Sequence, residues 1–130
     1  MKDLAKFFDA HKRIAIAGGP KTGKTTLAKE QADRTGHLLL GTDDYMHLPW
    51  GQVVDAIFHD PILEKERWII EGVQVPRLLR AGLPADAVLW LEVTHEWRTD
   101  AQESMAKACR TVFDDWLRSH PTAYLMDLAG

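Results

Sequence analysis

Cysteine and long hydrophobic runs are the scarcest features of this 130-residue sequence, which contains one cysteine, Cys109. A single cysteine excludes an internal disulfide framework and fits a reducing compartment, and we expect a small buried side chain there. No apolar run approaches the roughly 20 residues of a membrane span, and the charged N-terminal stretch lacks the apolar centre of a signal peptide. We therefore predict a soluble, cytoplasmic protein with no membrane partner.

An excess of positive charge is also absent, because 16 lysines and arginines stand against 19 acidic residues and give a net charge of -3. No overall basic field recruits nucleic acid, so only a local basic patch would bind it. The six histidines show no zinc-ligand spacing, which argues against a zinc site. The length suffices for one domain with a real core, and we expect residues 1–130 to form it.

What the sequence does contain is an alternation of short apolar runs with helical patterns. Strands are predicted at 13–17, 38–40, 67–73 and 87–93, and helices after Asp3 and at 24–35, 52–58, 76–82 and 96–118. The segment 122–130 fits either a short fifth strand or a frayed helix. Strands alternating with helices imply parallel pairing through crossovers. We predict an α/β three-layer sandwich, with a parallel sheet of four to five strands and helices on both faces.

The last predicted helix carries its own apolar stripe. Apolar side chains recur along it at helical spacing, and the expected buried positions are Trp97, Ala101, Met105, Ala108, Val112 and Trp116. Packing in the core is the expected role for most of the five tryptophans.

The segment between the first predicted strand and the helix that follows it is rich in glycine. Residues 18–25 read GGPKTGKT and match the pattern G-x-x-x-x-G-K-[ST] without a mismatch. An ordinary glycine-rich turn is the alternative, but the strand–loop–helix context favours a phosphate-binding loop, in which inward N–H groups and the helix N-terminus hold the anion. Lys24 would reach the β- and γ-phosphates, and the Thr25 hydroxyl would ligate Mg²⁺. The residues expected to bind the nucleotide are Gly18, Gly19, Pro20, Lys21, Thr22, Gly23, Lys24, Thr25 and Thr26.

Two adjacent carboxylates, Asp43 and Asp44, follow the second predicted strand. A carboxylate that faces the phosphate loop would accept a proton from a substrate hydroxyl or hold a metal-bound water. The alternative is a helix cap or a turn, in which Asp is also favoured. Tyr45, His47 and Trp50 either line a substrate pocket or pack as ordinary amphipathic residues.

A third acidic position, Glu71, stands in the cluster IIEGV, 69–73, where an apolar run leads to an acid, which is the Walker B pattern of an acid that supports Mg²⁺. Glu92 is a rival, but Val93 follows it, so it can still lie within its strand. We therefore favour Glu71 as the metal-supporting acid. In open parallel sheets ligands bind beyond the carboxyl ends of the strands, which is where all these clusters fall.

These motifs together resemble P-loop kinases of small molecules, in particular the uridine kinase and nucleoside kinase-like branch. The resemblance spans about residues 13–110 and rests on GGPKTGKT, on Asp43-Asp44-Tyr45 and on Glu71-Gly72, with weaker matches at Asp86 and Arg98. It implies the strand order 2-3-1-4 with a possible fifth strand.

The same resemblance assigns roles to single residues. It implies that Asp43, or else Asp44, activates the acceptor hydroxyl and that Glu71 lies near Mg²⁺. It also implies that lid cations clamp the transferring phosphate, although a solvated helix face explains each of them equally well. These cations are Arg98, Lys107 and Arg110.

Two features depart from the family pattern. The family's lid carries several closely spaced arginines, whereas Arg98 has no arginine neighbour. A loop after the family's fifth strand holds the adenine, and this sequence stops just after YLMDLAG, which leaves the choice between ATP and GTP open.

We predict an ATP-dependent phosphotransferase that moves the γ-phosphate of MgATP to a small-molecule acceptor, with nucleosides and nucleotides as the favoured class. The expected cofactors are ATP, or another nucleoside triphosphate, and Mg²⁺. Two alternatives stay open. One is a P-loop NTPase or nucleotide-dependent interaction module without an acceptor, and the other is a 5′-hydroxyl kinase of nucleic acid ends.

Overall fold

A parallel five-stranded sheet forms the centre of the computed structural model, which describes residues 3–92, 97–121 and 123–128. The strands are β1 (Arg13–Ala17), β2 (Leu38–Gly41), β3 (Trp68–Glu71), β4 (Ala87–Leu91) and β5 (Leu125–Leu128). They lie in the order β2-β3-β1-β4-β5, and every neighbouring pair is parallel. The predicted order is therefore confirmed, and the C-terminal segment forms a strand rather than a helix.

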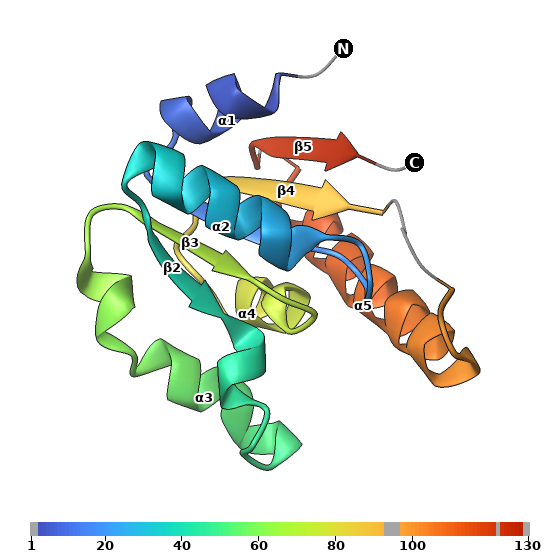
Figure 1. The fold of residues 1–130 in the computed structure, drawn as a ribbon. Helices are drawn as coiled ribbons and strands as arrows, with labels where there is room; N and C mark the ends of the chain where they lie inside the picture. The colour runs from blue at the N-terminus through green and yellow to red at the C-terminus, as the bar shows by residue number, and fades with distance from the viewer. Residues whose placement is uncertain (1–2, 93–96, 122, 129–130) are drawn as a thin grey trace.

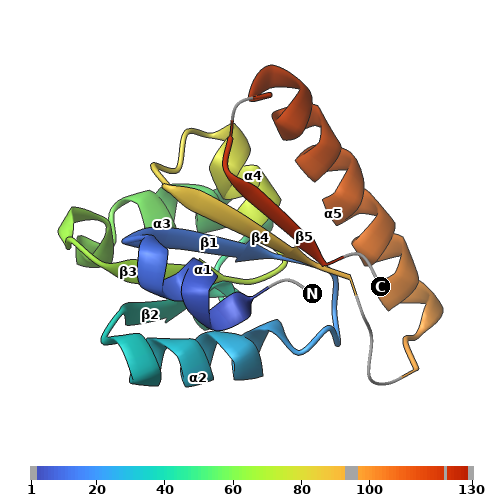
Figure 2. The ribbon, with the colours of Figure 1, turned by 90° about the horizontal axis from the view of Figure 1, so that it is seen from above.

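Helices cover both faces of this sheet, as Figures 1 and 2 show. The helices are α1 (Leu4–Ala10), α2 (Lys24–Thr35), α3 (Val53–Phe58), α4 (Val75–Arg80) and α5 (Asp100–Ser119). Short 3₁₀ turns occupy Thr42–Tyr45, Trp50–Gln52 and Pro61–Glu64. Because successive strand residues point to opposite faces, Ile14 and Ile16 of β1 pack with α1 and α2, whereas Ala15 and Ala17 pack with α3, α4 and α5. The predicted three-layer α/β sandwich is confirmed.

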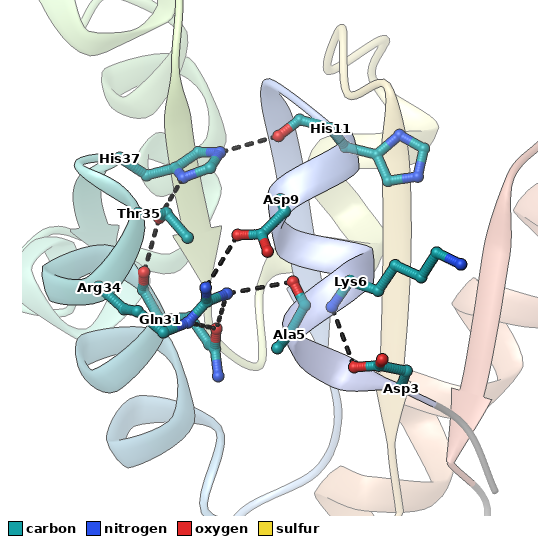
Figure 3. A network of polar contacts seen from close by, with 9 residues as sticks. All are labelled: Asp3, Ala5, Lys6, Asp9, His11, Gln31, Arg34, Thr35 and His37. Atoms are coloured by element: carbon teal, nitrogen blue, oxygen red, sulfur yellow. Dashed lines mark hydrogen bonds and ion pairs between the residues drawn. The ribbon is translucent and has the colours of Figure 1, made fainter.

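Polar contacts fasten α1 to α2, as Figure 3 shows. The Arg34 guanidinium donates to the Asp9 carboxylate at 2.9 Å and to the Ala5 carbonyl at 3.1 Å. His37 is buried at the end of α2, where its ring contacts the Thr35 hydroxyl and the His11 carbonyl. Burial lowers the pKa of His37, so the folded protein favours the neutral imidazole.

The start and buried face of α5 differ from the prediction. The expected start at Glu96 lies outside the described residues, and the structure begins the helix at Asp100, where Thr99 and Gln102 form a capping box. The buried side chains are Ala106, Cys109, Phe113 and Trp116. The expected stripe is therefore wrong at Ala101, Met105 and Ala108, which are exposed, and at Trp97, which precedes the helix. The physical reason is that the sheet and the phosphate loop pack against the helix face that contains Ala106, Cys109 and Phe113. Each of these residues lies one position after an expected one.

Candidate functional site

The phosphate loop joins β1 to α2 at the carboxyl end of the sheet, as the motif predicts. The loop is packed so tightly that side chains are excluded from its first two positions. A Cβ atom on Gly18 would lie 2.4 Å from the Leu91 carbonyl oxygen, and one on Gly19 would lie 2.7 Å from the Ala106 Cβ. These two positions require glycine because Leu91, the last residue of β4, and Ala106 of α5 lie directly against the loop.

The side chain of Lys24 is folded back into this loop. Its ammonium donates to the Gly19 carbonyl at 2.8 Å, and the residue is only 8% exposed. Burial lowers the pKa of Lys24, while the carboxylates of Glu71 and Asp43 oppose that shift. The cation therefore stands at the centre of the loop, where it would attract the β- and γ-phosphates of a nucleotide.

Thr25, in the first turn of α2, contacts Glu71 at the end of β3. The Thr25 hydroxyl lies 3.2 Å from each carboxylate oxygen of Glu71, and Glu71 is 4% exposed. Burial raises the pKa of Glu71, and the nearby Lys24 ammonium counteracts the rise. Hydroxyl and carboxylate oxygens are the donors that Mg²⁺ prefers, so these two residues fit a magnesium ion.

A cavity of about 430 Å³ opens in front of the loop. Asp43, on the 3₁₀ turn after β2, lines this cavity, and its charge acts on both Lys24 and Glu71. Asp44 is exposed and is not among the lining residues. Sequence reasoning missed four further lining residues, whose spacing carries no motif: Met46, Val73, Gln102 and Met105.

Two solved structures of small-molecule kinases have a similar fold. A shikimate kinase from Acinetobacter baumannii, in complex with shikimate, matches with a TM-score of 0.52 at 14% identity, over 94% of this chain and 86% of its own. A gluconokinase from Sinorhizobium meliloti 1021 matches with a TM-score of 0.59 at 13% identity, over 92% and 84%. The fold is that of P-loop kinases.

An uncharacterised protein from Eubacterium ventriosum ATCC 27560 has the same fold, with a TM-score of 0.54 at 16% identity over 88% of this chain and 86% of its own. No protein-family model and no curated protein sequence matches this chain. The resemblance to P-loop kinases inferred from the motifs is confirmed at the level of the fold.

In this P-loop kinase fold, the structure brings one of the three expected lid cations to the phosphate loop. The Arg98 Nε atom donates to the Pro20 carbonyl at 2.8 Å, and its side chain is 6% exposed. Its Nη2 atom is buried beside Gly19 and has no hydrogen-bond partner within the described part of the chain. Arg98 does not line the cavity, but it offers an unused donor beside Gly19 of the phosphate loop.

The other two cations lie away from the cavity. The Arg110 guanidinium lies 4.8 Å from the centre of the Trp90 ring, pairs with Asp114 at 3.0 Å and is 3.7 Å from Asp127. Lys107 is exposed on α5. Neither residue lines the cavity. Arg110 instead stabilises the packing of α5 against β4 and β5.

The remaining candidates also have their own partners. β4 ends at Leu91, so the expectation that Glu92 lies within it is wrong, and Val93 lies outside the described residues. The Glu92 carboxylate accepts a hydrogen bond from the Trp90 indole. The Tyr45 hydroxyl donates to the Asp60 carboxylate, which raises the pKa of Tyr45 to about 12.

Trp50 is half exposed, with the Arg77 guanidinium 4.7 Å from its ring centre. His47 is exposed, and none of Tyr45, His47 and Trp50 lines the cavity beside the phosphate loop. Asp86 accepts a hydrogen bond from the backbone of Arg13 at the opposite end of the sheet, where a second cavity of about 420 Å³ contains no phosphate-binding loop. No helix among the described residues is long and apolar enough to cross a membrane.

Proposed function

We propose that the protein is an ATP-dependent small-molecule kinase, which transfers the γ-phosphate of MgATP to a hydroxyl group of its acceptor. The observation that carries this proposal is the cavity in which Asp43 faces Lys24 and Thr25, with Glu71 in contact with Thr25. A candidate base, the phosphate loop and the Thr25 hydroxyl border the same space, and Glu71 contacts Thr25 from outside it. A nucleotide-binding module would not need the base.

In the proposed reaction the loop and Lys24 bind the triphosphate, and Thr25 with Glu71 holds Mg²⁺. The ion, when bound, neutralises charge on the β- and γ-phosphate oxygens. Arg98 donates its unused Nη2 hydrogens to the transferring phosphoryl group. Asp43 accepts the proton of the acceptor hydroxyl while the hydroxyl oxygen forms a bond to the γ-phosphorus. The bond from that phosphorus to the β-γ bridging oxygen breaks, and ADP leaves.

The acceptor is proposed to be a small hydroxylated molecule. Two structural neighbours are a shikimate kinase and a gluconokinase. In this chain the cavity walls combine the apolar side chains of Met46, Val73 and Met105 with the Gln102 amide. A nucleoside or nucleotide stays within the proposal as one acceptor class among several.

A radiolabelled γ-phosphate screen tests the proposal. The acceptors are nucleosides, nucleotides, hydroxy acids that include shikimate and gluconate, and an oligonucleotide with a 5′-hydroxyl. Once an acceptor is found, Asp43→Asn should lower the transfer rate by about 10²–10⁴ and leave ATP affinity nearly unchanged, because the substitution removes a general base. Asp44→Asn should have a much smaller effect, since Asp44 does not line the cavity.

The outcomes separate the alternatives. Transfer at the wild-type rate by both variants would show that these acids form only a turn. Loss of transfer in Asp44→Asn alone would keep the mechanism and move the base by one position. ATP hydrolysis that Asp43→Asn slows, with no acceptor ever phosphorylated, would indicate an NTPase.

A further inference from the structure

The most exposed large aromatic side chain of the described residues stands beside the phosphate loop. Trp97 is 95% exposed, although tryptophan is on average a well-buried residue. Its backbone is nevertheless held in place. The Lys21 ammonium donates to the Trp97 carbonyl at 3.1 Å, and the adjacent Arg98 donates to the Pro20 carbonyl at 2.8 Å. A flat apolar ring is thus presented to solvent next to the tip of the loop.

The order of the strands indicates which part of a nucleotide lies on the Trp97 side. The phosphate loop follows the central strand β1, whereas Asp43 and Glu71 lie at the ends of β2 and β3 on one side of it. Trp97 belongs to the connection that follows β4, on the other side. In phosphoryl transfer the attacking and leaving oxygens are roughly in line through the phosphorus. With the acceptor on the β2–β3 side, the ADP half must extend towards β4.

We propose that Trp97 is the platform on which the base of the nucleoside triphosphate stacks. No aromatic residue, Trp97 included, is among the described residues that line the cavity, so the base would stack outside it, beside Pro20 and Lys21 at the tip of the loop. An aromatic ring stacks on every base because each base has a π-face. The platform therefore supports binding without choosing between adenine and guanine. This inference rests on the proposed kinase function, because the direction of the nucleotide follows from the position of the acceptor.

Calorimetric titration of the full chain tests the platform by separating the base from the phosphates. The ligands are ATP, GTP and inorganic triphosphate, each with Mg²⁺. Trp97→Ala should weaken ATP and GTP binding by the same factor, roughly tenfold to a hundredfold, because base–aromatic stacking is lost. The affinity for inorganic triphosphate should not change. Trp97→Phe, which keeps an aromatic face, should retain most of the ATP affinity.

Tyr124→Ala provides the matched control, since Tyr124 is another exposed aromatic residue and lies outside the cavity lining. Its affinities for all three ligands should equal those of the wild type. Unchanged ATP affinity in Trp97→Ala would overturn the platform and leave the kinase proposal intact. An equal loss of ATP and inorganic triphosphate would also overturn it, because the ring would then be supporting the loop. A wild-type protein that binds none of the three ligands would overturn both proposals.

Discussion

Replacement of Gly72 by alanine should be among the most damaging single changes at the site. Gly72 follows Glu71 directly, and its φ of +145° lies in a region that L side chains rarely adopt. A Cβ atom there would lie 1.8 Å from the Thr42 hydroxyl oxygen and 2.8 Å from the Thr42 Cβ. Thr42 is fully buried and cannot turn into solvent to make room.

Two costs add in this variant. A non-glycine residue held in a disfavoured backbone region costs about 1–3 kcal/mol, and overpacking a buried site costs a further 1–3 kcal/mol or so. We therefore expect Gly72→Ala to lower the free energy of unfolding by about 2–6 kcal/mol, which is a large share of the roughly 5–15 kcal/mol of a typical domain. Urea denaturation followed by circular dichroism measures this loss.

Gly36→Ala separates backbone strain from crowding. Gly36 caps α2 with a φ of +79°, but a Cβ atom there would meet nothing within 4 Å. The free energy of unfolding of Gly36→Ala should fall by only about 1–2 kcal/mol, the cost of a left-handed conformation for an L residue. If Gly72→Ala loses no more than Gly36→Ala, the contact with Thr42 does not restrict the site and the reasoning is wrong.

Two further expectations concern the metal and the pH dependence of folding. Thr25→Ala and Glu71→Gln should each raise the Mg²⁺ concentration needed for the half-maximal transfer rate, and Glu92→Gln should not. The reverse pattern in a magnesium titration would mean that Glu92, which follows β4, supports the ion instead of Glu71. Because burial lowers the pKa of His37, the unfolded chain takes up a proton there at a higher pH than the folded protein does. The contribution of His37 to the free energy of unfolding should therefore be fully present above pH 6.5, the ordinary value, and should be lost as the pH falls below it. His37→Gln should remove this part of the decrease in urea denaturation between pH 7 and pH 5, and an unaltered slope would contradict the assignment.

The elements next to the phosphate loop could be predicted from the sequence almost to the residue. The predicted ranges 13–17 and 24–35 coincide with β1 and α2, and Gly36 caps α2 in the left-handed conformation. Here a buried apolar run, a glycine motif and a helix stop signal agree. The contact between Thr25 and Glu71 was likewise predictable, because parallel strands bring their carboxyl ends to one edge.

Tertiary packing decided what local patterns could not. The last segment fitted a strand or a helix by itself, and pairing of Val88 in β4 with Leu125 fixes it as β5. In α5 two apolar faces competed, and packing against Gly19 of the phosphate loop favours the one that contains Ala106. The side chain of Arg110 was expected near the phosphates, but its contacts with Trp90 and Asp127 hold it against β4 and β5, outside the cavity lining.

The bond between the Lys24 ammonium and the Gly19 carbonyl has a consequence for how fast the site turns over. Thr22 also donates to this carbonyl, at 3.1 Å, so the loop supplies an internal partner for both side chains. An arriving phosphate must displace the carbonyl from Lys24, and binding becomes an exchange of one partner for another whose net gain is smaller than the new contact alone. In the proposed kinase, the Gly19 carbonyl would accept the hydrogen bond of the Lys24 ammonium again when ADP departs. Because product release limits the rate of many enzymes, an internal competitor of this kind would, in the proposed kinase, lower nucleotide affinity and shorten the residence time of the product.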